Sequence, residues 1–97
     1  MQAGEGIIGI DISKDSFDVV LRGTGSEQHR VFSNDQKGFT SLVAWAGKQP
    51  ERVAHVCMEA TGSYWEGLAE ALYQGGYTVS VVNPYQIKRY GDHLLNR

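Results

Sequence analysis

The sequence predicts an α/β domain built on a mixed five-stranded sheet, in the order β-β-β-α-β-α-β-α. In the first third of the chain, apolar and polar residues alternate with a period of two, which is typical of strands. Two later segments repeat their apolar residues at intervals of three and four, which is typical of helices. A further apolar strand follows each of these helices. A strand reached through a helix runs parallel to its neighbour by a right-handed crossover.

Three strands in succession open the chain, and we expect them at residues 7–12, 16–22 and 27–33. The connection at residues 13–15 has the length of a hairpin turn, and a glycine-containing second turn follows at residues 23–26. The third strand is polar, which is typical of the edge of a sheet. These features predict an antiparallel meander with the third strand at its edge.

The first helix is expected to follow this meander and to end near Gly47. Its candidate N-caps are Ser33, Asn34 and Asp35. Ser33 also has the capping-box spacing to Gln36. The residues of its buried stripe follow helical spacing and are Phe39, Leu42, Val43 and Ala46.

The second helix begins with another capping-box pair, Ser63 and Glu66. Its buried stripe again follows helical spacing and consists of Trp65, Leu68, Ala69 and Leu72. The glycines at residues 75–76 are expected to end it, because glycine readily adopts the left-handed conformation that closes many helices.

The remaining strands are expected at residues 52–59 and 77–82, with the first strand in the middle of the sheet beside the fourth. Asn83 as a cap and Pro84 at the first helical position predict a third helix through residues 85–97. This helix has no stop signal before Arg97. We therefore expect residues 1–97 to be a single domain, truncated at its end.

The composition excludes several classes of protein. A net charge of −2 argues against a strong stand-alone nucleic-acid binder, because such domains usually carry a basic excess. One cysteine excludes a disulfide framework and favours a reducing compartment. No run approaches the ~18 apolar residues that span a bilayer, and the chain does not begin with a signal peptide. We expect a cytoplasmic protein without a membrane partner.

Two carboxylates fall where an open sheet with parallel strands binds its ligands, at the carboxyl ends of the central strands. Asp11 lies one residue before the end of the first strand, and Glu59 closes the fourth. If these strands are neighbours, ~4.8 Å apart, both side chains reach one site. Carboxylate oxygens suit Mg²⁺ or Mn²⁺, which in pairs promote phosphodiester displacement. In the plainer alternative, Asp11 caps a turn and Glu59 accepts hydrogen bonds from amides of the next helix.

Three segments of the chain resemble one protein family. They are Gly-Ile-Asp-Ile-Ser-Lys at residues 9–14, Met-Glu-Ala-Thr-Gly-Ser-Tyr-Trp at residues 58–65 and Gly-Tyr-Thr-Val-Ser-Val-Val-Asn-Pro at residues 76–84. In the same order, these motifs are similar to the N-terminal domain of the DEDD insertion-sequence transposases. That family is related to the Piv DNA invertases, and its domain is similar to the RuvC Holliday-junction resolvase.

The resemblance implies a ribonuclease-H-like fold and a D-E-D-D site that binds divalent metal for DNA cleavage and strand transfer. Asp11 matches the first Asp of that site, and Glu59 matches its Glu. The family's last two Asp lie beyond residue 97, so this chain is expected to bind Mg²⁺ or Mn²⁺ weakly and to be inactive alone. The resemblance also implies DNA as the partner, an element-encoded guide RNA in some members, and a homo-oligomer of the intact protein.

Three basic residues are candidates for contact with nucleic acid. Lys14 follows the strand of Asp11 and is equally consistent with an exposed turn. Lys88 and Arg89 lie with tyrosines on the predicted third helix, where cations commonly serve only to solvate a face. The backbone amides at residues 61–63 are a candidate anion site or an ordinary helix cap.

Other polar residues favour simpler interpretations. Asp18 and Asp92 are expected to be exposed to solvent, as most carboxylates are. His55 and Cys57 share a face of the fourth strand with Glu59, but two ligands fall short of a zinc site. Core packing is favoured for both, since cysteine often behaves as a small apolar residue.

Two functions from other classes compete with the nuclease hypothesis. One is an ATP-binding domain of the actin and sugar-kinase type, but the turn after Asp11 lacks the glycines of a phosphate loop. The other is a non-catalytic nucleic-acid interaction module that kept only the scaffold. The presence of both Asp11 and Glu59 argues against this module.

Overall fold

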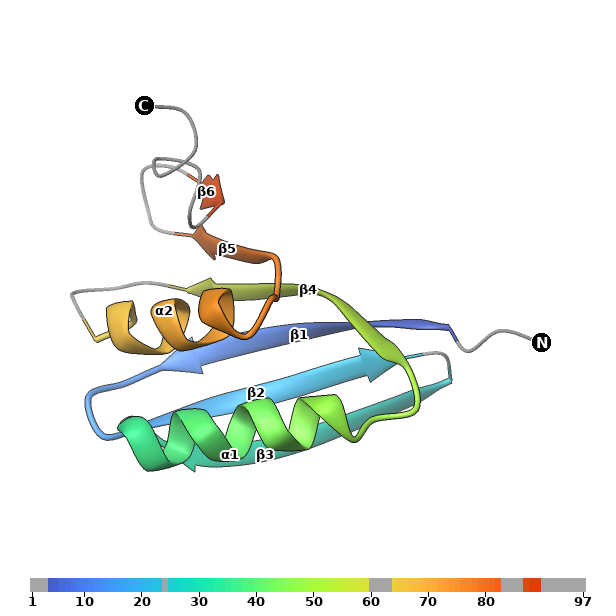
Figure 1. Ribbon diagram of the computed structural model, residues 1–97, viewed down its shortest axis with the longest axis horizontal. Coiled ribbons are helices and arrows are strands. Elements are labelled where there is room, and N and C mark those ends of the chain that lie inside the picture. Colours follow the sequence, from blue (N-terminus) through green and yellow to red (C-terminus); the bar gives the residue numbers. More distant parts are fainter. Residues whose placement is uncertain (1–3, 24, 60–63, 83–86, 90–97) are drawn as a thin grey trace.

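The computed structural model describes residues 4–23, 25–59, 64–82 and 87–89. In chain order, its elements are β1 (Glu5–Ile12), β2 (Ser16–Gly23), β3 (Ser26–Ser33), α1 (Gln36–Gly47), β4 (Arg52–Glu59), α2 (Glu66–Gln74), β5 (Val79–Val82) and β6 (Ile87–Arg89). The strands form one sheet in the order β3-β2-β1-β4-β5-β6 (Figure 1). The α/β class, the edge position of β3 and the central position of β1 beside β4 are confirmed.

The strand directions follow from the connections. The hairpin-linked strands β1, β2 and β3 pair antiparallel, as the predicted meander requires. The strands reached through a helix pair parallel, β4 with β1 and β5 with β4. Since β1 and β4 run in the same direction, their carboxyl ends lie at the same edge of the sheet.

The predicted third helix is wrong over residues 87–89. These residues form β6, which pairs antiparallel with β5, so that Val82 lies opposite Ile87. This pairing satisfies backbone N–H and C=O groups along the edge of β5 that would otherwise lack ladder partners. The helix start expected at residues 83–86, and its continuation at residues 90–97, lie outside the described residues.

The pairing of β1 with β4 contains one irregularity. Gly6 pairs with Val53, whereas the next residue, Ile7, pairs with His55. Here β4 has one residue more than β1, which is the pattern of a β-bulge. Beyond this point the two strands remain in register to their last pair.

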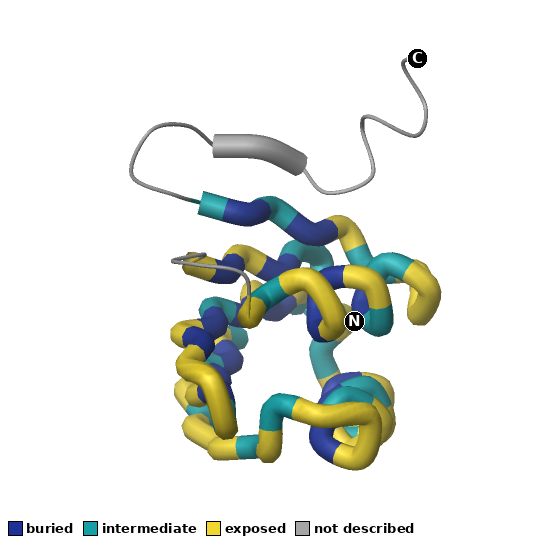
Figure 2. The backbone as a smooth tube through the Cα atoms, turned by 90° about the vertical axis from the view of Figure 1, so that its left-hand side faces the viewer, coloured by how far each residue is buried: buried dark blue, intermediate teal, exposed yellow. Residues whose placement is uncertain are grey.

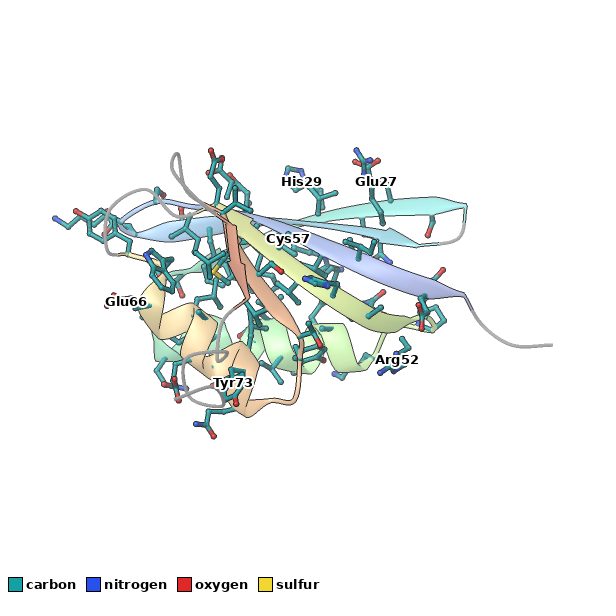
Figure 3. All side chains as sticks on the ribbon, turned by 90° about the horizontal axis from the view of Figure 1, so that it is seen from above. Glu27, His29, Arg52, Cys57, Glu66 and Tyr73 are labelled. Atoms are coloured by element: carbon teal, nitrogen blue, oxygen red, sulfur yellow. The ribbon has the colours of Figure 1, made fainter. Side chains whose placement is uncertain are left out.

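Both described helices lie on the same face of the sheet (Figure 3). Buried residues alternate with exposed or half-buried ones along β1 and β2 and along the last four residues of β4 (Figure 2), and the buried ones face α1 and α2. Together with buried residues of α1, α2 and β5, they form a single apolar cluster: Ile8, Ile10, Ile12, Phe17, Val19, Leu21, Leu42, Ala46, Val56, Met58, Leu68, Ala69, Leu72, Val79 and Val81. We call the other side of the sheet the open face. Ile7 and Val31 lie there, 53% and 62% exposed.

The start of α1 differs from the predicted capping box. Asp35 is the N-cap, and its carboxylate accepts a hydrogen bond from the Gly38 amide at 2.9 Å. Ser33 does not cap the helix but donates its hydroxyl to Asp35 at 2.8 Å. Gly38 is buried so close to β3 that a Cβ atom would collide with the carbonyl oxygen of Ser33. A glycine is therefore needed where α1 leaves the sheet.

Among the described residues, no side-chain hydrogen bond caps the start of the second helix. Its N-cap is Trp65, so Glu66 opens the helix instead of lying three positions inside it. Ser63, the other member of the predicted capping box, lies outside the described residues. The predicted end is confirmed: Gly75 is the C-cap, and Gly76 has the positive φ of 92° that favours glycine.

Candidate metal centre

Asp11 and Glu59 lie directly opposite each other in the parallel register of β1 and β4. Both are exposed, whereas the preceding residues, Ile10 and Met58, are buried against the helices. The two carboxylates therefore project from the open face at the carboxyl ends of neighbouring strands, whose backbones lie ~4.8 Å apart. This is the arrangement that the strand order predicted for these acids.

A third carboxylate lies in the same row. Asp18 is the partner of Asp11 in the antiparallel pairing of β1 with β2. It is exposed, as predicted, and its neighbours Phe17 and Val19 are buried on the helical side. Asp18, Asp11 and Glu59 thus follow one another across three adjacent strands of the open face.

An open hollow of ≈ 390 Å³ lies beside Asp11. Its lining residues come from three strands and are Gly9, Ile10, Asp11, Asp18, Val20 and His29. Figure 3 shows His29 and Glu27 projecting from the side of the sheet away from the helices. A larger cavity of ≈ 550 Å³ is lined by residues of α1 and α2, among them Phe39, Val43 and Glu70. It lies away from the acids, so we assign the chemistry to the open face.

The donor set of this face fits a hard cation in part. Asp11 and Glu59 supply carboxylate oxygens, and Mg²⁺ is commonly bound by one or two carboxylates together with water and substrate phosphates. Among the described residues, no three His, Cys, Asp or Glu side chains converge closely enough to hold a metal ion by themselves. The two acids can therefore contribute to a site whose other ligands come from elsewhere.

His55 and Cys57 lie on the open face and not in the core. His55 is half-buried, and its Nε2 atom is 2.6 Å from the Ser80 hydroxyl of β5. Cys57 is exposed, so the expectation of core packing is wrong for this residue. The reason is that both described helices cover the opposite face, which leaves Cys57 without an apolar layer above it.

The basic candidates are only partly described. Lys14 is exposed in the turn between β1 and β2, close in sequence to Asp11. Lys88 and Arg89 lie on the short strand β6 and not on a helix. The candidate anion site at residues 61–63 and Asp92 lie outside the described residues.

The sequence predicts Asn34 only as a candidate helix cap, but in the structure its side chain has other partners. Its side-chain amide donates to the carbonyl oxygens of Ser13 and Tyr64, both at 3.0 Å. The segment of Ser13 follows β1, and Tyr64 precedes α2. No spacing rule reveals such a contact, because the two partners are 21 and 30 residues away in the chain.

The neighbouring helix cap lowers the pKa of a carboxyl group. The Gly38 amide and then the Ser33 hydroxyl donate to Asp35, and together they lower the pKa of its carboxyl below the usual value. The charged form of Asp35 is therefore the one that caps α1.

Sequence comparisons identify similar proteins for nearly the whole chain. The profile of a DEDD family described as transposase matches residues 8–97. The pilin gene-inverting protein of Moraxella bovis is 39% identical over 89 residues, which cover 90% of this chain and 28% of that protein. The pilin gene-inverting protein of Moraxella lacunata gives the same values. The chain thus spans less than a third of the length of these curated relatives.

The similarity of this chain to solved structures concerns only its fold. RuvC of T. thermophilus, in complex with a Holliday junction substrate, is similar with a TM-score of 0.59 at 10% identity, over 82% of this chain and 65% of that one. YeaZ from Pseudomonas aeruginosa has a TM-score of 0.52 at 13% identity, over 81% and 44%. None of the described helices is long and apolar enough to cross a membrane.

Proposed function

Because this chain belongs to the DEDD transposase family, we propose that it forms the N-terminal part of a metal-dependent DNA recombinase. In this proposal, Asp11 and Glu59 bind Mg²⁺ or Mn²⁺ for the cleavage and strand transfer of DNA. The observation that carries it is the register of β1 and β4, which sets the two carboxylates opposite each other on the open face.

The chain's own residues then have distinct tasks. A divalent ion supplies positive charge that stabilises the attacking and leaving oxygens of a phosphodiester. Asp11 and Glu59 would hold that charge at the edge of the sheet, where a nucleic-acid backbone would approach from the open face. In this proposal Lys14, exposed in the next turn, would contact a neighbouring phosphate.

We expect the 97-residue chain alone to be inactive on DNA. Two carboxylates leave most positions around an Mg²⁺ ion to water, so its affinity for metal is expected to be low. The curated relatives are more than three times as long as the matched segment, which leaves ample chain for the remaining ligands. Use of a guide RNA and assembly into a homo-oligomer stay predictions of the family resemblance.

The turn after β1 supports a nuclease over an ATP-binding domain. A phosphate loop offers free backbone amides to its ligand. Here the Ser13 amide already donates to the Ser16 carbonyl at 2.9 Å, and residues 12–15 contain no glycine. This amide is therefore occupied within the turn that connects β1 with β2.

The test uses the full-length protein and a DNA substrate that it cleaves in the presence of Mn²⁺. Asp11→Asn and Glu59→Gln should each lower the cleavage rate by more than about 100-fold. The loss of a residue that only supports a metal ligand already costs up to about 100-fold, and these residues would be ligands themselves. Glu5→Gln is the matched control, because Glu5 lies on the same strand as Asp11 but at its far end, 3.3 Å from Arg52. It should leave the rate unchanged.

Two outcomes would reject the proposal. Full cleavage by both acid variants would show that Asp11 and Glu59 are not ligands of a catalytic metal. Tight ATP binding that depends on Asp11 would favour the kinase-like alternative. Cleavage of DNA by the purified 97-residue chain would contradict the expected inactivity alone.

A further inference from the structure

We propose that Asn34 is a positioning residue of the candidate metal centre, since one side chain ties together the segments that follow Asp11 and Glu59. The inference rests on the proposed function of those two acids. Among the described residues, the pairing of β1 with β4 ends at Asp11 and Glu59. Within the described residues, contacts other than this ladder must therefore link the turn after β1 to the start of α2.

The contacts of Asn34 bridge these continuations. Its Nδ2 atom donates to the carbonyl oxygens of Ser13 at 3.0 Å and Lys14 at 3.4 Å, in the turn that follows β1. The same atom donates to the carbonyl oxygen of Tyr64 at 3.0 Å, on the chain that follows β4. The Asn34 backbone amide donates to Asp15 at 2.9 Å, in the same turn as Ser13.

The chemistry of this contact requires an amide. All three side-chain partners are carbonyl oxygens, which only accept hydrogen bonds, so the nitrogen of the Asn34 amide must face them. Aspartate has nearly the same shape but would place carboxylate oxygens against these carbonyls. An Asn34→Asp substitution therefore removes the tie and adds repulsion while the side-chain volume stays almost constant.

Asn34 is itself held on both sides. It lies between the last residue of β3, Ser33, and the cap of α1, Asp35, which are linked by their own hydrogen bond at 2.8 Å. The side chain thus extends from a fixed junction toward two loops. A metal site needs its ligands held within about 0.5 Å, and supporting residues of this kind provide that precision.

The experiment measures Mn²⁺ binding to the full-length protein by electron paramagnetic resonance, together with the metal dependence of DNA cleavage. Asn34→Asp should raise both the Mn²⁺ dissociation constant and the Mn²⁺ concentration for half-maximal cleavage by about 10- to 100-fold. Excess Mn²⁺ should restore most of the cleavage rate, since the acids themselves are intact.

The matched control is Gln28→Ala. Gln28 donates to Gln49 at 2.8 Å and so also ties the β3 strand to a distant segment, but away from Asp11 and Glu59. Its loss should lower thermal stability without changing Mn²⁺ binding. If Asn34→Asp does not fold, Asn34→Ala removes the amide without adding a charge and provides the same comparison.

The outcomes separate this inference from the proposed function. If Asp11→Asn abolishes Mn²⁺ binding while Asn34→Asp binds within twofold of the unchanged protein, Asn34 is only a structural residue and the inference is overturned. Equal shifts in Asn34→Asp and Gln28→Ala would overturn it as well. If Asp11→Asn leaves both Mn²⁺ binding and cleavage intact, the proposed function fails and the inference fails with it.

Discussion

The two faces of the sheet are made from the same strands but have opposite properties. On one face, side chains from β1, β2, β4 and β5 join both described helices in a continuous apolar cluster. On the open face, the alternate residues of the same strands include Asp11, Asp18 and Glu59. The described part of the chain buries no polar or charged side chain, so none of its acids lies in the apolar cluster.

This difference separates stability from chemistry. Burying apolar area on the helical side supplies most of the free energy of folding. The open face contributes little burial, and its residues are therefore free to be selected for other properties. Substitutions at matching positions on the two faces should reveal this division directly.

The largest contrast is expected between two neighbouring isoleucines of β1. Ile8 is fully buried, so Ile8→Ala should lower the free energy of unfolding by about 2–5 kcal/mol. Ile7 is 53% exposed on the open face, and Ile7→Ala should cost no more than about 1 kcal/mol. Denaturant unfolding of the 97-residue chain, followed by tryptophan fluorescence, measures both. Equal losses would show that the open face is covered in solution.

A second contrast compares two glycines. Gly38→Ala would press a methyl group into the Ser33 carbonyl and should destabilise the chain by about 1–3 kcal/mol or more. At Gly9, on the open face, an added Cβ meets no atom within 4 Å, and φ is not positive. Gly9→Ala should therefore stabilise the chain by about 0.5–1 kcal/mol. Thermal melts of both variants test this prediction, and a loss at Gly9 would contradict it.

The smallest effect is expected at the paired acids. Asp18 and Asp11 are like charges directly opposite each other, so Asp18→Asn should stabilise the chain by about 0.2–1 kcal/mol. Added Mg²⁺ should reduce this gain by screening the pair. Glu27→Gln is the control, because Glu27 lies on the same face but 3.8 Å from Arg22, and its loss should not be stabilising. A destabilised Asp18→Asn chain would show that Asp18 has a favourable partner.

Much of the fold follows from local patterns. The alternation in β1 and β2 and the apolar stripes of both helices were enough to predict the elements from β1 to β5, their order and the direction of these five strands. The cap of α1 was predicted only as one of three candidates, Ser33, Asn34 and Asp35, and the folded chain uses Asp35. In α2 the N-cap is Trp65, so Glu66 does not have the inner position of the predicted capping box. The strand at residues 87–89 depends on the free edge of β5, which no local pattern encodes.

Some residues of the candidate site could also be predicted from the sequence, and others could not. Asp11 and Glu59 could be placed at one edge of the sheet because each lies at the end of its strand, and the predicted topology makes these two strands neighbours. The pairing of Asp18 with Asp11 required the register, and the exposure of Cys57 required knowing which face the helices cover. Asn34 could not be found from sequence, since its partners come from two loops that only the folded chain brings together.

The extra residue of β4 near Ala54 has a further consequence for how this site tolerates change. If Ala54 stayed in the chain but the ladder continued from the pair Gly6–Val53 without the bulge, Asp11 would lie beside Met58, whose side chain belongs to the core. A deletion of Ala54 itself should be tolerated, because the ladder would then be regular and Asp11 would still lie opposite Glu59. In this fold, an irregularity five pairs away from the acids thus sets the register in which they meet.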